Sequence, residues 1–290
     1  MTLEQLRIFI AVAERGHMTQ AAQALNVTQS AASAAVAALE ARHGVLLFDR
    51  VGRRLELSEA GRLFLPEAKA VLAQSASAGR VLDDLAGLER GQVRIAASQT
   101  VASYWLPPYL AAFAAARPAI DLSLSVGNTQ RVAAAVVDGS ADLGFVEGMV
   151  DSPVLQRLVV GHDRLSLYAA PDHPLAAKAV GVADLKAEQW IIREPGSGTR
   201  SAFEAALAKR GVDFASLTVL LELPSNEAVL AAVASSLALT AVSDLAAAPQ
   251  VAAGALARLA FDVVERPFQL LRHRERVASR ASTAFMALVQ

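Results

Sequence analysis

Residue types suited to reading DNA lie near the start of the chain. Thr28 precedes a predicted helix whose first exposed turns carry amide, hydroxyl and small side chains, namely Gln29, Ser30, Ser33 and Ala34. Glutamine can pair with adenine through two hydrogen bonds, serine can bond several base edges, and alanine leaves room for a thymine methyl group. Three arginines follow and suit contacts with phosphates or the adjacent minor groove, namely Arg50, Arg53 and Arg54.

The elements that must position these side chains follow one another with no spare residues. We predict a helix over residues 2–15, a second helix capped by Thr19, and a third helix over residues 28–43 that ends at Gly44. A core strand at residues 46–48 then leads into a hairpin that carries the arginines. This order is typical of a winged helix-turn-helix, which places one helix in the major groove of DNA.

A long helix should follow the hairpin, from Ser58 to about Leu88. Its apolar residues recur at alternating spacings of four and three, which is typical of a coiled-coil seam. We therefore expect dimerisation through Phe64, Val71, Ala78, Leu82 and Leu85. The alternative is an amphipathic helix that lies on its own domain.

Beyond Gly91 the chain alternates strands with helices, which indicates a mostly parallel sheet and two similar α/β lobes. Polar clusters follow strand ends and open helices in both halves: Ser98, Gln99 and Thr100; Asn128 and Thr129; Ser197, Gly198 and Thr199; and Asn226. Helix N-termini favour anions, and strand ends of open α/β sheets line ligand crevices. Ordinary helix capping is the alternative for each cluster, but four clusters at one rim favour a small-molecule site.

The N-terminal segment resembles the DNA-binding domain of LysR-type transcriptional regulators. The matching residues are Leu6, Phe9, Val12, Ala21, Ala22, Leu25, Gln29, Ser33, Leu39, Glu40, Gly44, Leu47, Phe48, Arg50, Arg54, Leu57, Ala60 and Gly61. The similarity continues to the C-terminus. It implies an operator with an inverted repeat, a homodimer or a tetramer built from two dimers, and RNA polymerase as a further partner.

The second half resembles the branch of this family that regulates sulfur-assimilation and carbon-fixation operons. The residues that carry this likeness are Gly127 to Thr129, Val146 to Gly148, Arg193 to Arg200 and Ser225 to Ala228. The resemblance implies a periplasmic-binding-protein-like domain that senses a small, anionic metabolite. Glu147 would be a wall residue of that site, and would repel an anion unless it pairs with Arg193 or Arg200, or binds an ammonium or hydroxyl group.

The composition and the motifs of the chain argue against several other classes of function. The net charge is −1, so DNA contact must come from a local basic surface, and the absence of cysteine excludes disulfides and thiolate chemistry. The five histidines lack metal-ligand spacing, and no nucleophile motif is present, so we expect no cofactor and no enzyme activity. We expect a cytoplasmic protein that does not contact membranes, since the start does not read as a signal peptide. A solute-binding protein remains a rival hypothesis for residues 91–290, and an enzyme that uses the cleft is a second.

Together these observations predict an α/β protein with an α-rich winged helix-turn-helix domain, a linker helix and a two-lobed effector domain. The expected boundaries are 1–58 for DNA binding, 59–90 for dimerisation and 91–290 for the effector domain. Within the last, we expect lobe I at about 91–163 plus 263–290 and lobe II at about 164–262.

Overall fold

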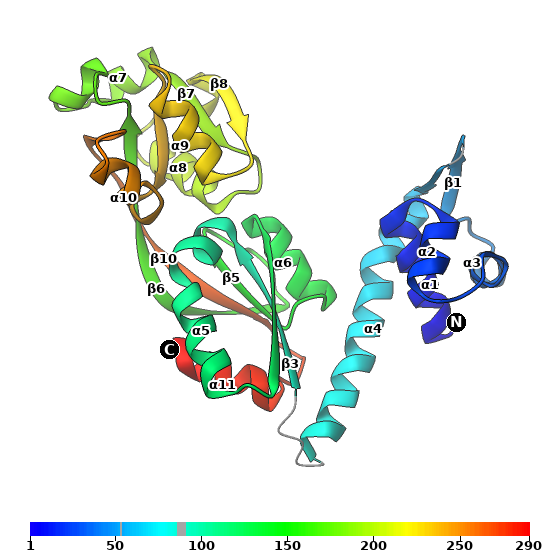
Figure 1. The fold of residues 1–290 in the computed structure, drawn as a ribbon. Helices are drawn as coiled ribbons and strands as arrows, with labels where there is room; N and C mark the ends of the chain where they lie inside the picture. Colours follow the sequence, from blue (N-terminus) through cyan, green and yellow to red (C-terminus); the bar gives the residue numbers. More distant parts are fainter. Residues whose placement is uncertain (53, 86–90) are drawn as a thin grey trace. The chain divides into compact units, whose positions relative to one another are not determined.

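The computed structural model describes residues 1–52, 54–85 and 91–290, and within 80–85 it describes the side chain of Leu82 alone (Figure 1). The predicted DNA contact Arg53 and the side chain of Leu85 therefore lie outside the described residues. The described chain forms two compact units. One is built from the elements up to α4, and the other from β3 onward.

The first unit is a winged helix-turn-helix with a long helix attached. Its elements are α1 (Leu3–Arg15), α2 (Met18–Ala24), α3 (Gln29–His43), β1 (Phe48–Val51), β2 (Arg54–Leu57) and α4 (Glu59–Leu85). The strands β1 and β2 pair in an antiparallel hairpin. A core of large side chains holds the three short helices, the hairpin and the start of α4 together, among them Leu6, Phe9, Val12, Val36, Leu39 and Phe48.

Local capping explains most helix ends in this unit. Thr28 Oγ1 accepts a hydrogen bond from Ala31 N at 3.1 Å, and Gly44 ends α3 in the left-handed conformation with φ 65°, as predicted. The predicted cap at Thr19 is wrong. The helix α2 starts two residues earlier, with His17 at the N-cap and no side-chain capping bond, so Thr19 lies inside the first turn.

The predicted strand over residues 46–48 is also shifted. Leu46 is 68% exposed, and the strand begins only at Phe48. The backbone of Leu47 forms its hydrogen bonds outside a strand ladder. Its N–H donates to Glu40 Oε1 at 2.7 Å, and its carbonyl oxygen accepts from Ser58 N at 3.0 Å. Ser58 in turn caps α4 by accepting from Gly61 N.

The second unit has two α/β lobes. The elements of lobe I are β3 (Gly91–Ser98), a π-helical turn (Val101–Trp105), α5 (Pro107–Ala116), β4 (Ile120–Gly127), α6 (Thr129–Asp138), β5 (Leu143–Glu147) and the final α11 (Arg280–Val289). Those of lobe II are α7 (Val182–Ala187), β7 (Gln189–Arg193), α8 (Gly198–Ala208), β8 (Thr218–Leu223), α9 (Asn226–Ala234), β9 (Thr240–Ser243) and α10 (Asp244–Ala252), with short 3-10 turns at Pro174–Ala177 and Phe214–Ser216.

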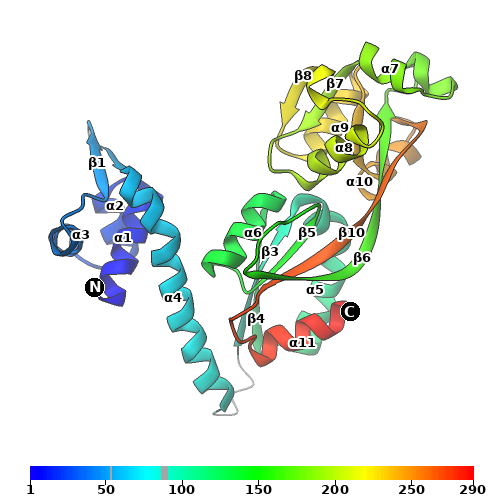
Figure 2. The same ribbon diagram turned by 180° about the vertical axis from the view of Figure 1, so that it is seen from behind.

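Two long strands connect the lobes, β6 (Leu155–Ala169) and β10 (Ala257–His273), which run side by side from one lobe to the other (Figure 2). They pair antiparallel and extend a sheet with the order β4-β3-β5-β10-β6-β9. The sheet is therefore mixed rather than mostly parallel, because lobe II is inserted between an outgoing and a returning strand. Among the described strands, the pairs of β3 with β4 and β5, and of β7 with β8, are parallel, and two isolated bridges, Ala179 with Ala260 and Trp190 with Leu239, are parallel as well.

Each lobe has its own buried core. Lobe I packs Phe145, Phe268 and Phe285 together, while lobe II packs Trp190 against Phe203 with ring centroids 4.9 Å apart. Separate cores, linked in the described chain by β6 and β10 and by contacts at the interface between the lobes, allow each lobe to behave as a rigid body. The residues that meet between the lobes therefore decide their relative position.

A pair of glycine substitutions in α4 tests the packing of the first unit. A Cβ on Gly61 would lie 2.1 Å from the Leu47 carbonyl oxygen, whereas a Cβ on Gly79 would meet nothing within 4 Å. We expect Gly61→Ala to lower the free energy of unfolding by about 1–3 kcal/mol. Gly79→Ala should raise it by up to about 1 kcal/mol, because alanine favours the helix.

Denaturant unfolding followed by circular dichroism measures both variants. Equal stability of Gly61→Ala and the wild type would contradict the close contact between the start of α4 and the residue before β1.

Candidate functional site

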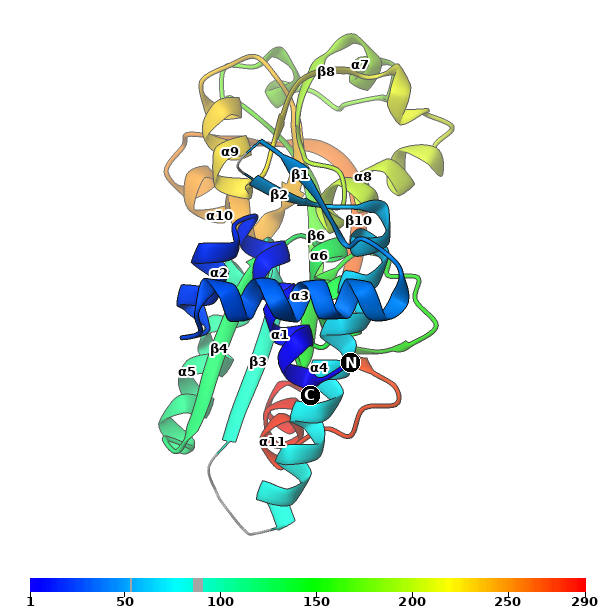
Figure 3. The ribbon, with the colours of Figure 1, turned by 90° about the vertical axis from the view of Figure 1, so that its right-hand side faces the viewer.

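One side of α3 is buried and the other faces solvent (Figure 3). Ala32, Val36 and Leu39 are buried against the core of the first unit. Of the residues predicted to contact bases, Gln29, Ser30 and Ala34 are exposed and Ser33 is half-buried. Helical spacing places Gln29 with Ser33, and Ser30 with Ala34, one turn apart on the outer side.

Thr28 has a structural role that fixes the start of this surface. Besides capping Ala31 N, its hydroxyl lies 3.1 Å from Ser30 Oγ. The bond orients Ser30 in the first turn, where it stays exposed. The exposed part of the first turns of α3 is thus a short strip of amide, hydroxyl and methyl groups.

The β1–β2 hairpin carries the two described arginines on different faces. Arg50 lies opposite Leu55, and Arg54 lies opposite Val51, which is one register position further along. Successive residues of a strand point to opposite faces, so the two guanidinium groups leave the hairpin on either side. Both residues are exposed, and neither forms an ion pair within the described part of the chain. The predicted cluster is therefore a hairpin with positive charge on both faces.

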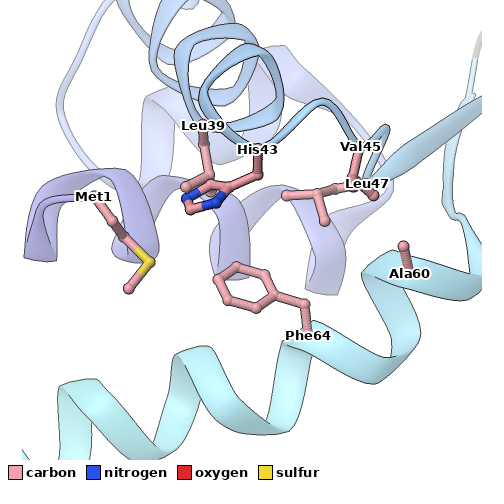
Figure 4. Close-up of a pocket in the computed structure, with 7 residues that line it drawn as sticks. All are labelled: Met1, Leu39, His43, Val45, Leu47, Ala60 and Phe64. Atoms are coloured by element: carbon pink, nitrogen blue, oxygen red, sulfur yellow. The ribbon is translucent and has the colours of Figure 1, made fainter.

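An apolar pocket of about 290 Å³ lies between the end of α3 and the start of α4 (Figure 4). Seven residues line it: Met1, Leu39, His43, Val45, Leu47, Ala60 and Phe64. Met1 and Val45 are themselves substantially exposed. The pocket thus continues an apolar surface at this end of the first unit.

The predicted seam of α4 divides into two parts. Phe64 packs against Phe9 in the core of its own unit, with ring centroids 5.1 Å apart. Val71, Ala78 and Leu82 are exposed, and Leu82 is 68% accessible. The intramolecular alternative therefore accounts for Phe64, while Val71, Ala78 and Leu82 are not among the described residues that form the core of this unit.

In the second unit, all the predicted small-molecule residues lie where the two lobes meet. Ser98, Gln99 and Thr100 follow β3, Asn128 and Thr129 follow β4, Glu147 ends β5, Ser197 to Thr199 follow β7, and Asn226 begins α9. Most are nearly fully buried. The polar clusters predicted from strand ends are thus brought to one interface.

On one side of this interface, Gln99 of lobe I bridges to lobe II. Its Oε1 accepts from Asn226 N at 2.7 Å and from Arg193 Nη1 at 3.1 Å, and its Nε2 donates to Glu227. Asn226 Nδ2 donates to Thr100 Oγ1 at 3.0 Å, and Tyr104 OH donates to Glu227 Oε1 at 2.7 Å. These five contacts tie the end of β3 and the turn after it to the start of α9 and the end of β7.

The first turn of α8 packs directly on the end of β5. A Cβ on Gly198 would lie only 1.6 Å from the Glu147 carbonyl oxygen, so glycine is needed for this approach. The Thr129 hydroxyl donates to the same carbonyl oxygen at 2.8 Å. Asn128 Nδ2 reaches Glu194 Oε1 at 3.3 Å, which adds a further link between the lobes.

Of the alternatives considered for Glu147, pairing with Arg193 or Arg200 does not occur in the structure. Arg193 binds the neighbouring Glu194, with Nε to Oε2 at 2.8 Å, and Arg200 binds Glu204 and Glu222. Neither pairs with Glu147. The Glu147 carboxylate instead accepts from Ser98 Oγ and from Thr199 Oγ1, the latter at 3.4 Å.

Sequence reasoning missed several functional neighbours of this interface. Arg266 on β10 forms a buried ion pair with Asp163 on β6 at 2.7 Å, and its Nη1 donates to Thr199 Oγ1 at 3.2 Å. Tyr104 and Glu227 were also not singled out. In the sequence, the buried ion pair is visible only as two opposite charges, Asp163 and Arg266, within strand segments that are otherwise largely apolar.

Glu227 is a charged group of this interface whose pKa is shifted from its ordinary value. Burial acts to raise the pKa of Glu227, but hydrogen bonds from Tyr104, its own backbone, Gln99 and Ser225 outweigh burial and lower it. Burial and the bond to Glu227 raise the pKa of Tyr104 well above its usual range, so Tyr104 remains a donor. Within the described residues, no group of three or more histidine, aspartate or glutamate side chains could hold a metal ion. No helix in the same described ranges is both long and apolar enough to cross a membrane.

The Glu227 contacts predict a pH-dependent stability. Because folding lowers the pKa of Glu227, its contribution is present above the ordinary pKa of 4.5 and is lost as the pH falls below it. Glu227→Gln should lower the free energy of unfolding at neutral pH by about 1 kcal/mol, with exposure limiting the effect. The variant should also lose less stability than the wild type between about pH 5 and pH 3.

Thermal unfolding across this pH range measures the effect, with Asp151→Asn as a control because Asp151 is an exposed carboxylate of the second unit that forms no ion pair with another described residue. If the unfolding temperature of the wild type and of Glu227→Gln changed equally with pH, the proposed role of Glu227 would be excluded.

Comparison with known proteins follows the same division of the chain. The family model described as "Bacterial regulatory helix-turn-helix protein, lysR family" matches residues 3–62, and the model described as "LysR substrate binding domain" matches residues 86–290. An Escherichia coli K12 relative named as the uncharacterized HTH-type transcriptional regulator YeiE is 37% identical over 288 residues, covering 99% of this chain and 96% of the relative. A probable RuBisCO transcriptional regulator of Trichormus variabilis is 33% identical, covering 98% and 86%.

Solved structures agree with the sequence relatives. Full-length CbnR complexed with its target DNA has a TM-score of 0.67 at 25% identity, covering 100% of this chain and 99% of CbnR. The regulatory domain of Synechocystis CcmR in complex with 2-PG has a TM-score of 0.63 at 27% identity, covering 69% of this chain and 96% of that domain.

These matches confirm the predicted fold class and the resemblance to the carbon-fixation branch, and they exclude the enzyme and solute-binding hypotheses. From its N-terminal helix-turn-helix to its two-lobed second unit, the chain is a member of the LysR family of DNA-binding transcriptional regulators.

Proposed function

We propose that the chain binds an inverted-repeat operator as a homodimer, with α3 in the major groove. The observation that carries this proposal is the exposed strip of Gln29, Ser30, Ser33 and Ala34 on an α3 whose other side is buried. Thr28 fixes the N-terminal end of the strip by capping the helix. Helix-turn-helix proteins contact base edges with the N-terminal residues of this helix.

The hairpin would lie over the DNA backbone beside that groove. Arginines on both of its faces can bind phosphates on either side of the hairpin, and such contacts set position and salt dependence rather than sequence preference. We keep Arg53 in this set from its place between Gly52 and Arg54 in the sequence. One copy carries few such charges, which favours binding by two copies.

Self-association would use the exposed part of α4. Val71, Ala78 and Leu82 present an apolar row to solvent, and the apolar pocket between α3 and α4 offers further surface. A row of exposed apolar side chains on a helix is unfavourable unless a partner covers it. We retain Phe64 and Leu85 as flanking members of the seam.

The interface between the lobes would bind a small, anionic effector. The proposed contacts are Ser98, Gln99, Thr100, Asn128, Thr129, Glu147, Ser197, Gly198, Thr199 and Asn226. The starts of α6, α8 and α9 all lie there, and helix N-termini favour anions. The 2-PG complex of the CcmR regulatory domain supports this assignment. An effector that favours one arrangement of the lobes would change the spacing of the DNA-reading heads.

We further propose the boundaries 1–58, 59–90 and 91–290 for DNA binding, dimerisation and effector binding. Two dimers would assemble into a tetramer on DNA in the cytoplasm and contact RNA polymerase. The family membership supports these finer proposals.

The DNA-reading role of Gln29 has a direct test. Gln29→Ala should weaken binding to a selected operator by about 1–3 kcal/mol and leave binding to unrelated DNA nearly unchanged, because only the base contact is lost. Gln23→Ala serves as the matched control, since Gln23 is an exposed glutamine on α2.

Fluorescence anisotropy with operator DNA, obtained by selection from random sequences with the wild-type protein, provides the measurement. An equal loss on operator and unrelated DNA would show that Gln29 does not read bases.

The dimer seam has its own test. Leu82→Glu should shift the protein toward monomer, because a carboxylate would be buried at the seam. Leu63→Glu is the control, since Leu63 is 71% exposed on the same helix but about 100° around it from Phe64.

Sedimentation equilibrium measures the assembly of both variants. A wild type that is monomeric at micromolar concentration, or a Leu82→Glu variant that dimerises as well as the wild type, would contradict the seam.

A further inference from the structure

The lobe interface contains a buried carboxylate, Glu147, that pairs with neither of the two buried guanidinium groups nearby, Arg193 and Arg266. Arg266 is paired with Asp163 through Nε at 2.9 Å and Nη2 at 2.7 Å, and Arg193 is paired with Glu194. The remaining Nη1 of Arg266 goes to the Thr199 hydroxyl, and that of Arg193 goes to Gln99 and Asn226. Both arginines are therefore fully engaged. Glu147, which is 1% exposed, forms no ion pair in the part of the chain that the structure describes.

The hydrogen bonds of Glu147 leave room for a further donor. An ionised carboxylate has about four acceptor positions and no donor. Two hydroxyl groups contact the Glu147 oxygens, one on Oε2 from Ser98 and one on Oε1 from Thr199. A buried carboxylate without a cation is costly unless more donors reach it. A ligand between the lobes must therefore bring a donor to Glu147 and cannot present a bare anionic oxygen there.

The start of α8, which packs on Glu147, favours an anion, whereas Glu147 needs a hydrogen-bond donor. The other helices that begin at this interface are capped: Asn128 Oδ1 accepts from Arg131 N at α6, and Ser225 Oγ accepts from Ala228 N at α9. Ser197 occupies the N-cap of α8 but makes no capping bond. Its Oγ is buried and has no hydrogen-bond partner among the described residues, although the residue is only 2% exposed.

The backbone at this helix end offers donors as well. Among the described residues, no acceptor bonds the N–H groups of Gly198 and Thr199, and both residues are buried. Unpaired N–H groups at the positive end of a helix suit an oxyanion. The uncapped Ser197 hydroxyl is a second donor at the same place. Gly198 brings this helix end into contact with the Glu147 carbonyl.

An anion-favouring helix end and an unneutralised carboxylate thus lie next to each other. We propose that the effector is a small oxyanion that keeps a hydrogen-bond donor of its own, such as an acidic hydroxyl group. The anionic oxygens face Ser197, Gly198 and Thr199, and the donor faces Glu147. This inference rests on the proposed function of the lobe interface as the effector site. It predicts selection against oxyanions that carry no proton at neutral pH.

Inorganic phosphate and sulfate are the probes, because they have the same shape while only phosphate retains a hydroxyl near pH 7. The wild-type full chain should bind phosphate at least about tenfold more tightly than sulfate in calorimetry, since sulfate leaves Glu147 without its donor. Glu147→Gln should reduce this preference to within about threefold, because the amide can donate to sulfate. Glu194→Gln is the matched control and should keep the preference, since Glu194 has Arg193 as its partner.

Equal binding of the two anions by the wild type, an unchanged preference in Glu147→Gln, or binding of neither anion would overturn the inference. The proposed function would survive if an anionic metabolite without a hydrogen-bond donor of its own binds and Thr100→Val and Thr199→Val both abolish that binding. It would fail together with the inference if the loss of these two hydroxyls affects no ligand that binds the protein.

Discussion

The contact between the first turn of α8 and the end of β5 is the constraint on which the lobe interface depends. It exists because position 198 has no side chain, so that the helix can approach the Glu147 carbonyl. This approach buries Glu147 and brings Thr199 between its carboxylate and Arg266. Arg266 and Asp163 belong to the two strands that connect the lobes. A displacement of the start of α8 therefore acts directly on those strands.

This arrangement gives a physical route from a bound molecule to the relative position of the lobes. The lobes have separate cores, and bonds such as those of Gln99 with Asn226 hold them together. A ligand that replaces some of these bonds and adds its own changes the relative stability of the lobe arrangements. The ligand can change the equilibrium between these arrangements by no more than the difference between its binding free energies for them.

Local signals in the sequence predicted the first unit well. The caps at Thr28 and Ser58 and the stops at Gly16 and Gly44 depend on neighbouring residues, and all four are present. The error at Thr19 came from a polar residue one position inside a helix whose true N-cap, His17, provides no capping bond.

The second unit was predicted less completely, because its decisive contacts join residues far apart in the sequence. The polar clusters at strand ends were found, since the end of a strand and the start of a helix are local features. The pairing of Asp163 with Arg266 was not found, because it depends on the register of two antiparallel strands. Of the alternatives left open for Glu147, the structure shows hydroxyl contacts from Ser98 and Thr199, while Arg193 pairs with the adjacent Glu194.

A footprint on the protein's own upstream DNA, with and without a bound oxyanion, tests the central claim most directly. The account predicts two protected half-sites separated by about one helical turn or a multiple of it. Addition of the anion should change the extent or spacing of protection. Protection that is identical with and without an anion known to bind between the lobes, or no protection at any site, would contradict the account.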